Sequence, residues 1–357
     1  HYEVRVGDGR PPPSWMEGSE LGRHLRRTRA DGLSAIEHGY GTPWGYQPLR
    51  ETVARLLSER AIQVHSRQVL LTQGANHALD LIIRHLLEPG DKVLVDAPGY
   101  YPLFGKLKLS KVSMLGVPRL PDGPDLDALH TLLKRHRPKV FFTQSLAHNP
   151  TGSSISLPKA HKLLRLAAEF DCLVVEDDPF ADLLPAGAPR LAALDQLDRV
   201  LYVSSFSKTL SAGLRVGYIA GAPERIAALC DLKMVTVVST SDCVERVVHQ
   251  LISAGQYRRH IARLKTRLAE AHGPATRALE RAGVKVHPGD PGGYYLWVEL
   301  PGNTDELELV RRAASHGIFL APGAVFYPDR QGSFPAMRVN VAYAADARFI
   351  RFLRSVR

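Results

Sequence analysis

Lys208 stands in a setting that suggests covalent chemistry. It follows the apolar residues 200–203, which read as a buried strand, and it lies within residues 205–209, which read Ser-Phe-Ser-Lys-Thr. Arg215 follows seven residues after Lys208. A lysine at a strand end, surrounded by hydroxyls and near an arginine, is suited to form an imine beside a bound phosphate. The pattern predicts that Lys208 attaches a phosphorylated carbonyl compound, with Ser205 and Arg215 as ligands of its phosphate.

A second phosphate-binding signal lies earlier in the chain. Residues 72–76 read Thr-Gln-Gly-Ala-Asn and lead directly into a predicted helix. The backbone amides of Gly74, Ala75 and Asn76 and the positive end of that helix would therefore face an anion. A glycine turn before a helix, a strand-end hydroxyl and an exposed arginine are the alternatives that need no ligand. The presence of all these groups in one predicted pocket favours a phosphate site.

Pyridoxal phosphate combines a lysine imine with a phosphate, and it also needs an acid at its pyridine nitrogen and a flat group against its ring. Asp177 is the candidate acid, because it follows the apolar residues 172–175 and active sites of open α/β sheets lie at the carboxyl ends of strands. A carboxylate there keeps the ring nitrogen protonated and the ring able to accept electrons. The alternative is a helix cap before Pro179. The neighbouring Glu176 and Asp178 are expected to be structural or solvated.

Three further residues fit the ring and the substrate. Asn149, within the sequence His-Asn-Pro-Thr-Gly, can donate to the phenolic oxygen of the cofactor, although this is also ordinary turn sequence. Tyr100 can lie flat on the ring, or it can be a core or surface aromatic. Arg338 shares a strand face with Asn340 and can bind a substrate carboxylate. An exposed strand arginine is the commoner case.

The composition describes a globular protein. The chain has 357 residues, 45% of them hydrophobic, and a formal net charge of +10, but its lysines and arginines are scattered through predicted helices. Cys172, Cys230 and Cys243 show no metal-ligand spacing, which favours a reducing cytoplasm and predicts no metal site. No apolar run approaches the roughly 18 residues of a membrane span. The chain begins with His1, which leaves open a missing upstream segment.

The order of the elements predicts an α/β fold. Helices alternate with short apolar strands, which are expected at residues 92–96, 140–143, 172–175 and 200–203. Such strands suit a sheet with helices on both faces, so we expect a three-layer sandwich with a mostly parallel sheet. A long helical stretch over 245–282 then leads to a smaller α+β unit. The expected organisation is an N-terminal arm that packs with the small domain or a partner, a large cofactor-binding domain and a small C-terminal domain, over residues 1–35, 36–245 and 246–357.

With these residues placed, the chain resembles fold-type I pyridoxal-phosphate aminotransferases of class I and II, close to the aminoadipate and kynurenine aminotransferases and to the effector domains of MocR regulators. The resemblance runs from about Tyr40 to the end of the chain. It implies that Lys208 is the imine lysine, Asp177 the partner of the ring nitrogen and Asn149 the donor to the phenolic oxygen. It also implies that Tyr100 is the stacking ring and that Arg338 binds the α-carboxylate of the substrate. The phosphate ligands that it implies are Ala75, Asn76, Ser205 and Arg215.

The resemblance also implies a homodimer, because Tyr40 is similar to a tyrosine that reaches the phosphate from the neighbouring subunit. One position departs from the family. A tyrosine generally stands three residues after the ring-nitrogen aspartate and donates to the phenolic oxygen, whereas this chain has Phe180. Loss of that donor should raise the pKa of the lysine–cofactor imine. We therefore expect a competent cofactor site whose transamination is slow.

The function implied is transfer of an amino group between an amino acid and a 2-oxo acid by a ping-pong mechanism. The alternative is the sensor domain of a MocR-type regulator, whose DNA-binding domain would precede His1, and nucleic acid is expected as a partner only in that case. About a hundred further upstream residues with basic helices would favour the regulator. The sequence leaves the substrates open. Gly7 and Gly9 are equal candidates for a glycine that approaches the substrate closely.

Overall fold

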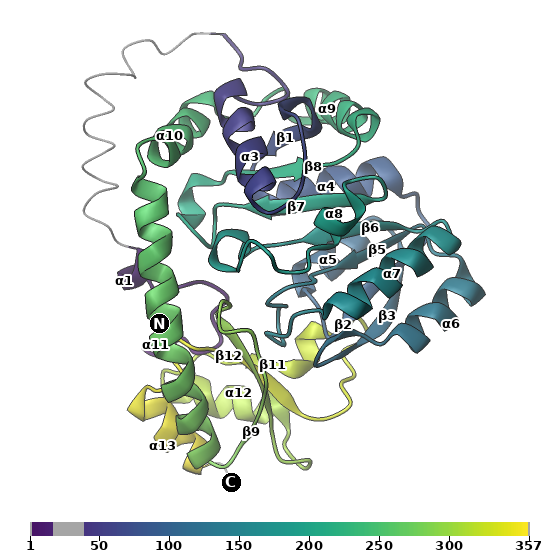
Figure 1. Ribbon diagram of the computed structural model, residues 1–357. Helices are drawn as coiled ribbons and strands as arrows, with labels where there is room; N and C mark the ends of the chain where they lie inside the picture. The colour runs from purple at the N-terminus through teal and green to yellow at the C-terminus, as the bar shows by residue number, and fades with distance from the viewer. Residues whose placement is uncertain (1, 17–38, 356–357) are drawn as a thin grey trace.

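The computed structural model describes residues 2–16 and 39–355. A large sheet with helices on both sides forms one part of the molecule, and a smaller sheet with its own helices forms the other (Figure 1). Over the described residues, no helix combines the length and apolarity that crossing a bilayer requires.

The large sheet has the strand order β1-β8-β7-β6-β5-β2-β3-β4. Its strands are β1 (Val69–Thr72), β2 (Lys92–Ala97), β3 (Ser113–Leu120), β4 (Gly123–Pro124), β5 (Val140–Thr143), β6 (Leu173–Asp177), β7 (Val200–Ser205) and β8 (Gly217–Ala220). The strands from β7 to β3 are parallel, whereas β8 runs antiparallel to both of its neighbours. The predicted, mostly parallel sheet is confirmed.

Helices pack on both faces of this sheet because side chains of successive strand residues point to opposite sides. Val93 and Val95 of β2 belong to one buried cluster, whereas Leu94 belongs to the other. The first cluster includes residues of α4 (Gly74–Leu86), α5 (Tyr101–Leu109) and α9 (Pro223–Val237). The second includes residues of α3 (Gln47–Glu59), α6 (Leu126–His136), α7 (Leu157–Glu169) and α8 (Leu191–Asp195). The three-layer sandwich is therefore confirmed.

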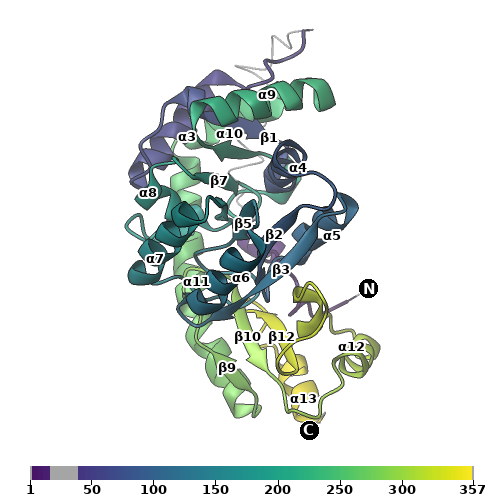
Figure 2. The same ribbon diagram turned by 90° about the vertical axis from the view of Figure 1, so that its right-hand side faces the viewer.

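The smaller sheet is antiparallel and has the order β11-β12-β10-β9. It lies below the large sheet in both ribbon views, together with two helices (Figure 2). These elements are β9 (Lys285–His287), β10 (Tyr295–Glu299), α12 (Glu306–Ser315), β11 (Ala321–Pro322), β12 (Ala336–Asn340) and α13 (Ala347–Ser355). The remaining short helices of the described chain are α1 (Pro13–Met16), η1 (Ser66–Gln68), η2 (Ala181–Leu183), η3 (Ala212–Leu214) and η4 (Gly323–Phe326).

The helical stretch expected over residues 245–282 consists of two helices, α10 (Asp242–Ser253) and α11 (Gln256–Arg281). Gly255 separates them with a φ of 72°, a left-handed conformation that ends a helix and that glycine adopts readily. α10 packs against α3, and α11 extends from there to the smaller sheet (Figure 1). The proposed boundary at residue 245 therefore falls inside α10.

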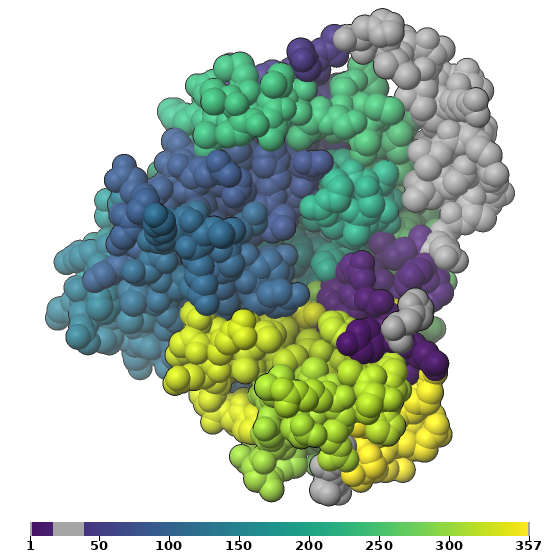
Figure 3. Space-filling view, turned by 180° about the vertical axis from the view of Figure 1, so that it is seen from behind, coloured from purple at the N-terminus to yellow at the C-terminus, as the bar shows by residue number. Residues whose placement is uncertain are grey.

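The beginning of the predicted N-terminal arm lies against the smaller sheet. Val4 forms a parallel bridge with Ile318, and the carbonyl of Val6 accepts a hydrogen bond of 2.7 Å from the amide of Asn340. This segment lies between the two parts of the molecule on the face shown in Figure 3. Residues 17–35 of the predicted arm lie outside the described residues.

Candidate active site

The predicted chemical residues gather at the carboxyl ends of the parallel strands. Asp177 ends β6, Asn149 follows β5 and Lys208 follows β7. A cavity of about 800 Å³ separates this edge from the smaller sheet, and its walls include Tyr100, Asn149, Lys208 and Arg338. Asp177 and Tyr100 line a much smaller adjoining hollow. The fold thus brings together residues that are up to 238 positions apart, because Tyr100 and Arg338 share the cavity.

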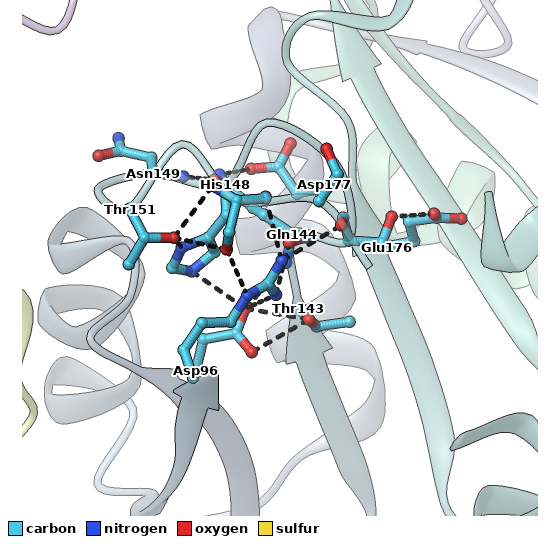
Figure 4. A network of polar contacts seen from close by, with 12 residues as sticks. Asp96, Thr143, Gln144, His148, Asn149, Thr151, Glu176 and Asp177 are labelled. Carbon is cyan, nitrogen blue, oxygen red and sulfur yellow. Dashed lines mark hydrogen bonds and ion pairs between the residues drawn. The ribbon is translucent and has the colours of Figure 1, made fainter. Parts of the chain in front are cut away.

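Asp177 is buried and half satisfied. Its Oδ2 accepts a hydrogen bond of 2.7 Å from Nε2 of Gln144, whereas its Oδ1 has no partner within the described chain (Figure 4). Burial raises the pKa of Asp177 to about 7, with Asp178 adding to the rise and Gln144 and Lys208 opposing it. The only hydrogen bond to this side chain comes from Gln144, so the alternative role as a helix cap finds no support in the described chain.

An unpaired buried carboxylate oxygen calls for a donor from a ligand. A protonated pyridine nitrogen supplies an N–H for the unpaired oxygen and a positive charge that favours the ionised form of the carboxylate. The residues present therefore fit pyridoxal phosphate on chemical grounds. Tyr100 lies beside the same carboxylate, and burial raises the pKa of its hydroxyl, so its ring is a neutral surface at ordinary pH.

Lys208 is buried and lines the cavity. Its Nζ donates a hydrogen bond to the carbonyl oxygen of Gly9. Burial, followed by the positive charge of Arg338, lowers the pKa of Lys208 to about 8. A lysine with such a pKa has a substantial neutral fraction near pH 7, which a nucleophilic amine requires.

The predicted phosphate ligands meet at the start of α4. Arg215 donates to the carbonyl of Gln73 at 3.3 Å and to Oγ of Ser207 at 3.4 Å. Gly74 has a φ of 76°, and a methyl group at its Cα would lie 2.5 Å from Nη2 of Arg215. A side chain at position 74 would therefore displace the guanidinium. The amides at the first turn of a helix have no partner within the helix, so they and Arg215 form a cradle for an anion.

The other predicted phosphate groups differ in exposure. Ser205 is buried at the end of β7, and its Oγ accepts a hydrogen bond from the amide of Ser207 at 3.4 Å. Asn76 is exposed on α4. Tyr40 is 87% exposed and extends from the large domain towards solvent.

Arg338 is buried and not the exposed strand arginine that was the commoner alternative. Its guanidinium donates to Oδ1 of Asn149 at 2.8 Å and to the carbonyl of Gly7 at 2.7 Å, and its Nε has no partner within the described chain. It also lies over the ring of Tyr295, 4.7 Å from the centroid. Because Oδ1 of Asn149 accepts from Arg338, the amide nitrogen of Asn149 is left to donate elsewhere.

Gly9, rather than Gly7, adjoins Lys208. The carbonyl of Gly9 accepts hydrogen bonds from Lys208 and, at 2.8 Å, from the hydroxyl of Tyr295. A methyl group on Gly9 would lie 3.1 Å from Nη2 of Arg338. The corresponding position on Gly7 lies 2.4 Å from the amide nitrogen of Ala321, so Gly7 permits close packing on the smaller sheet. The structure therefore separates two glycines that the sequence left equivalent.

The two carboxylates that flank Asp177 are structural, as expected. Glu176 is fully buried and accepts hydrogen bonds from the amides of Leu191 and Ala192 at 2.9 and 2.7 Å, at the start of α8. Asp178 is buried against Arg190, with 2.8 Å between Oδ2 and Nε. Burial also raises the pKa of Glu176 to about 7, but its oxygens point away from the cavity and into this helix start. Only Asp177 of the three has an unpaired oxygen beside the cavity wall.

Phe180 is fully buried and cannot replace the missing tyrosine hydroxyl. Its ring lies 5.5 Å from the ring centroids of both Tyr294 and Tyr295. This position therefore carries a buried aromatic ring and no side-chain hydrogen-bond donor.

Comparison with known proteins agrees with this geometry. The sequence profile of the family described as aminotransferase class I and II matches residues 7–355. The 2-aminoadipate transaminase of Thermus thermophilus is 33% identical over 333 residues, which are 91% of this chain and 82% of that protein. The uncharacterized HTH-type transcriptional regulator YdcR of Escherichia coli is 32% identical, over 88% of this chain and 68% of the regulator. The kynurenine aminotransferase of Pyrococcus horikoshii, solved in complex with PMP, matches with a TM-score of 0.90 at 29% identity, over 99% of this chain and 89% of that one.

The chain belongs to the aminotransferase class I and II family. The predictions of a fold-type I aminotransferase and of pyridoxal phosphate as its cofactor are confirmed at the level of the family. Membership in the family does not by itself assign a role to any residue of this chain.

The aminotransferase site also contains residues that the sequence reasoning missed. Gln144 binds Asp177, Ser207 binds Arg215, and Tyr295 binds Gly9. Ser207 lies inside the segment around Lys208, and Gln144 directly follows β5, so both were visible as polar residues at strand ends. Their partners were not visible, because the contacts of Gln144 and Tyr295 depend on how distant segments pack.

Proposed function

We propose that this aminotransferase transfers an amino group between an α-amino acid and a 2-oxo acid by a ping-pong mechanism at Lys208. One observation carries the proposal: the unpaired Oδ1 of Asp177 lies buried at the edge of the cavity in which Lys208 has a pKa near neutrality. A carboxylate for the ring nitrogen and an amine for the carbonyl carbon are the two groups on which this chemistry depends.

When bound, pyridoxal phosphate supplies a protonated ring that accepts the electron pair released at the α carbon of the substrate. Asp177 would keep the proton on the ring nitrogen, because its unpaired Oδ1 can accept that proton's hydrogen bond and its charge favours the protonated ring. The Nζ of Lys208, once free, takes the proton from the α carbon and holds it for return. Arg338 binds the α-carboxylate and replaces its hydrogen bond to the carbonyl of Gly7 with one to a charged oxygen.

The phosphate is expected to lie against the first turn of α4, with Arg215 and Ser205 as its side-chain ligands. Arg215 is exposed and bonded only to Gln73 and Ser207 at 3.3 and 3.4 Å. These are long hydrogen bonds that a charged phosphate can displace. Ser207 is therefore placed to contribute a further hydroxyl.

A homodimer with shared sites accounts for the exposure of Tyr40. Gly41, its neighbour, packs near Asp242, with 3.5 Å between the Cβ of Asp242 and the position of a methyl group on Gly41. Gly41 also lies near Ser239 and Thr240, which follow α9, and the end of that helix with the next residue exposes apolar side chains, namely Met234, Val235, Val237 and Val238. Exposed apolar side chains beside a strongly exposed tyrosine mark a surface suited to a second subunit. The proposed role of Tyr40 is to reach the phosphate of the partner subunit.

The test uses a panel of amino donors with 2-oxoglutarate, and it follows the absorbance of the bound cofactor. Conversion of the cofactor from its aldehyde form to its amine form by at least one donor, with return of the first form on adding 2-oxoglutarate, is expected. Binding of donors without conversion, for every donor in the panel, would contradict catalytic transamination.

The second candidate function is that of a ligand-sensing domain. It is favoured by the 32% identity to an HTH-type transcriptional regulator. A sensor would bind the cofactor through the same residues and would respond to an amino acid by a change of conformation. The donor panel separates the two, because a sensor would change its spectrum on binding and form no 2-oxo acid.

A further inference from the structure

Gln144 is a buried residue between two predicted cofactor ligands, and the mechanism above does not use it. Its Oε1 accepts a hydrogen bond of 2.9 Å from the backbone N–H of Asn149, and its Nε2 donates one of 2.7 Å to Oδ2 of Asp177 (Figure 4). Because the backbone N–H of Asn149 can only donate, the side-chain amide of Gln144 must turn its oxygen towards Asn149. The donor end of Gln144 must then face Asp177.

The backbone of Gln144 is itself held by a second set of buried groups. Its amide donates to Oδ2 of Asp96 at 3.0 Å, and its carbonyl accepts from Arg119 at 2.9 Å. Asp96 also accepts from the hydroxyl of Thr143, at 2.9 Å. The side chains of Asp96 and Arg119 are 5% and 0% exposed, so water does not compete for these contacts. Gln144 therefore has little freedom to turn away from Asp177.

We propose that Gln144 is a positioning residue, which holds Oδ2 of Asp177 so that Oδ1 faces the ring nitrogen of the cofactor and which fixes the loop of Asn149 to the same carboxylate. The inference rests on the proposed function of Asp177. It deepens that function, because the hydrogen bond from Gln144 opposes the rise in the pKa of Asp177 and fixes which oxygen of the carboxylate is left unpaired.

The charged form of a buried carboxylate is costly in free energy when no hydrogen-bond donor contacts it. Burial and the nearby Asp178 both favour the protonated form of Asp177, and the hydrogen bond from Gln144 favours the charged form. A protonated Asp177 would be a poor partner for a protonated ring nitrogen. The contact of Gln144 is the one side-chain donor to Asp177 within the described chain.

The test compares two ligands for the cofactor-free protein. One is pyridoxal phosphate, and the other is its analogue with a carbon in place of the ring nitrogen. Both carry the aldehyde and the phosphate, so their ratio of dissociation constants isolates the contact of Asp177 with the nitrogen. We expect the native protein to prefer pyridoxal phosphate, and we expect Gln144→Leu to reduce that preference about tenfold or more, the usual effect of losing a hydrogen bond to a charged group.

Gln144→Met sharpens the test, because methionine has a side chain of similar length but cannot donate a hydrogen bond to Asp177. It is expected to lose the preference as Gln144→Leu does. The matched control is Gln68→Leu, since the side-chain amide of Gln68 likewise accepts one hydrogen bond and donates another, from the backbone N–H of His65 and to the carbonyl of Gly221, each at 3.2 Å. The control should keep the native preference.

A ratio of dissociation constants that stays at the native value in the Gln144 variants would overturn the proposal, because a merely structural residue would weaken the binding of both ligands equally. A native protein that shows no preference for the ring nitrogen would instead refute the role of Asp177, and the proposed function would fail at that point.

Discussion

The pKa of Lys208 makes a quantitative prediction about how the protein captures its cofactor. Only the neutral amine attacks an aldehyde, so the rate of covalent capture should follow the neutral fraction of Lys208. With a pKa of about 8, about 9% of the amine is neutral at pH 7, against about 0.03% for a lysine with the ordinary value of 10.5. The capture at pH 7 should therefore be roughly 300-fold faster than for a solvated lysine.

The sign of the pH dependence follows from the same numbers. The neutral amine becomes the major form as the pH rises through about 8, so the rate should increase up to that value and level off above it. Arg338 is the second cause of the lowered pKa, after burial. Arg338→Met should therefore move the midpoint to higher pH and slow the capture at pH 7.

The assay adds pyridoxal phosphate to cofactor-free protein at a series of pH values, stops the reaction with borohydride and measures labelling of the peptide that contains Lys208 by mass spectrometry. Lys208→Ala gives the background from other lysines, and Lys233, whose pKa burial also lowers to about 8, is distinguished because it lies on a different peptide. A midpoint above about 10 for Lys208 would refute the reasoning, because burial and the charge of Arg338 would then have no effect on this amine.

Three further predictions concern the cofactor site. Phe180→Tyr should lower the pH midpoint of the colour change of the bound cofactor, since it restores a donor to the phenolic oxygen, and an unchanged midpoint would show that the hydroxyl does not reach it. Asp177→Asn should slow single-turnover transamination by roughly 100-fold while the cofactor remains bound, and a rate near the native one would remove Asp177 from the mechanism. After random subunit exchange between Lys208→Ala and Tyr40→Ala, the mixture should recover about a quarter of the native active sites, because about half of the dimers are mixed and one of the two sites in each is intact. No recovery after subunit exchange, measured as turnover of the mixture, would argue against a site shared between subunits.

The sequence predicted those parts of the protein that depend on local pattern. The apolar strands, the helices between them and the polar residues at strand ends were all visible, because a strand end and the turn after it are adjacent in the chain. Lys208, Asp177 and Asn149 belong to this class. The break at Gly255 was missed because the helical pattern continues on both sides of it, and a single glycine does not oblige a helix to end.

Contacts between distant segments could not be predicted in the same way. The approach of Gly9 to Lys208 joins residues 199 positions apart, and nothing in the first ten residues indicates which glycine makes it. Gln144 reaches Asp177 across 33 positions because β5 and β6 are neighbours in the sheet. The buried state of Arg338 depends likewise on the docking of the smaller sheet, which no strand pattern describes.

The three consecutive acids at the end of β6 differ in the groups that surround their negative charges. Glu176 accepts hydrogen bonds from the start of α8, and Asp178 forms an ion pair with Arg190. Of the three acids, Asp177 is therefore the one whose charge is available to a cation in the cavity. By pairing with Asp178, Arg190 therefore limits how far Asp178 raises the pKa of Asp177. If its charge were lost, the unscreened Asp178 would push its neighbour towards the protonated form, and the ring nitrogen would lose its counter-ion without any change in the cavity wall.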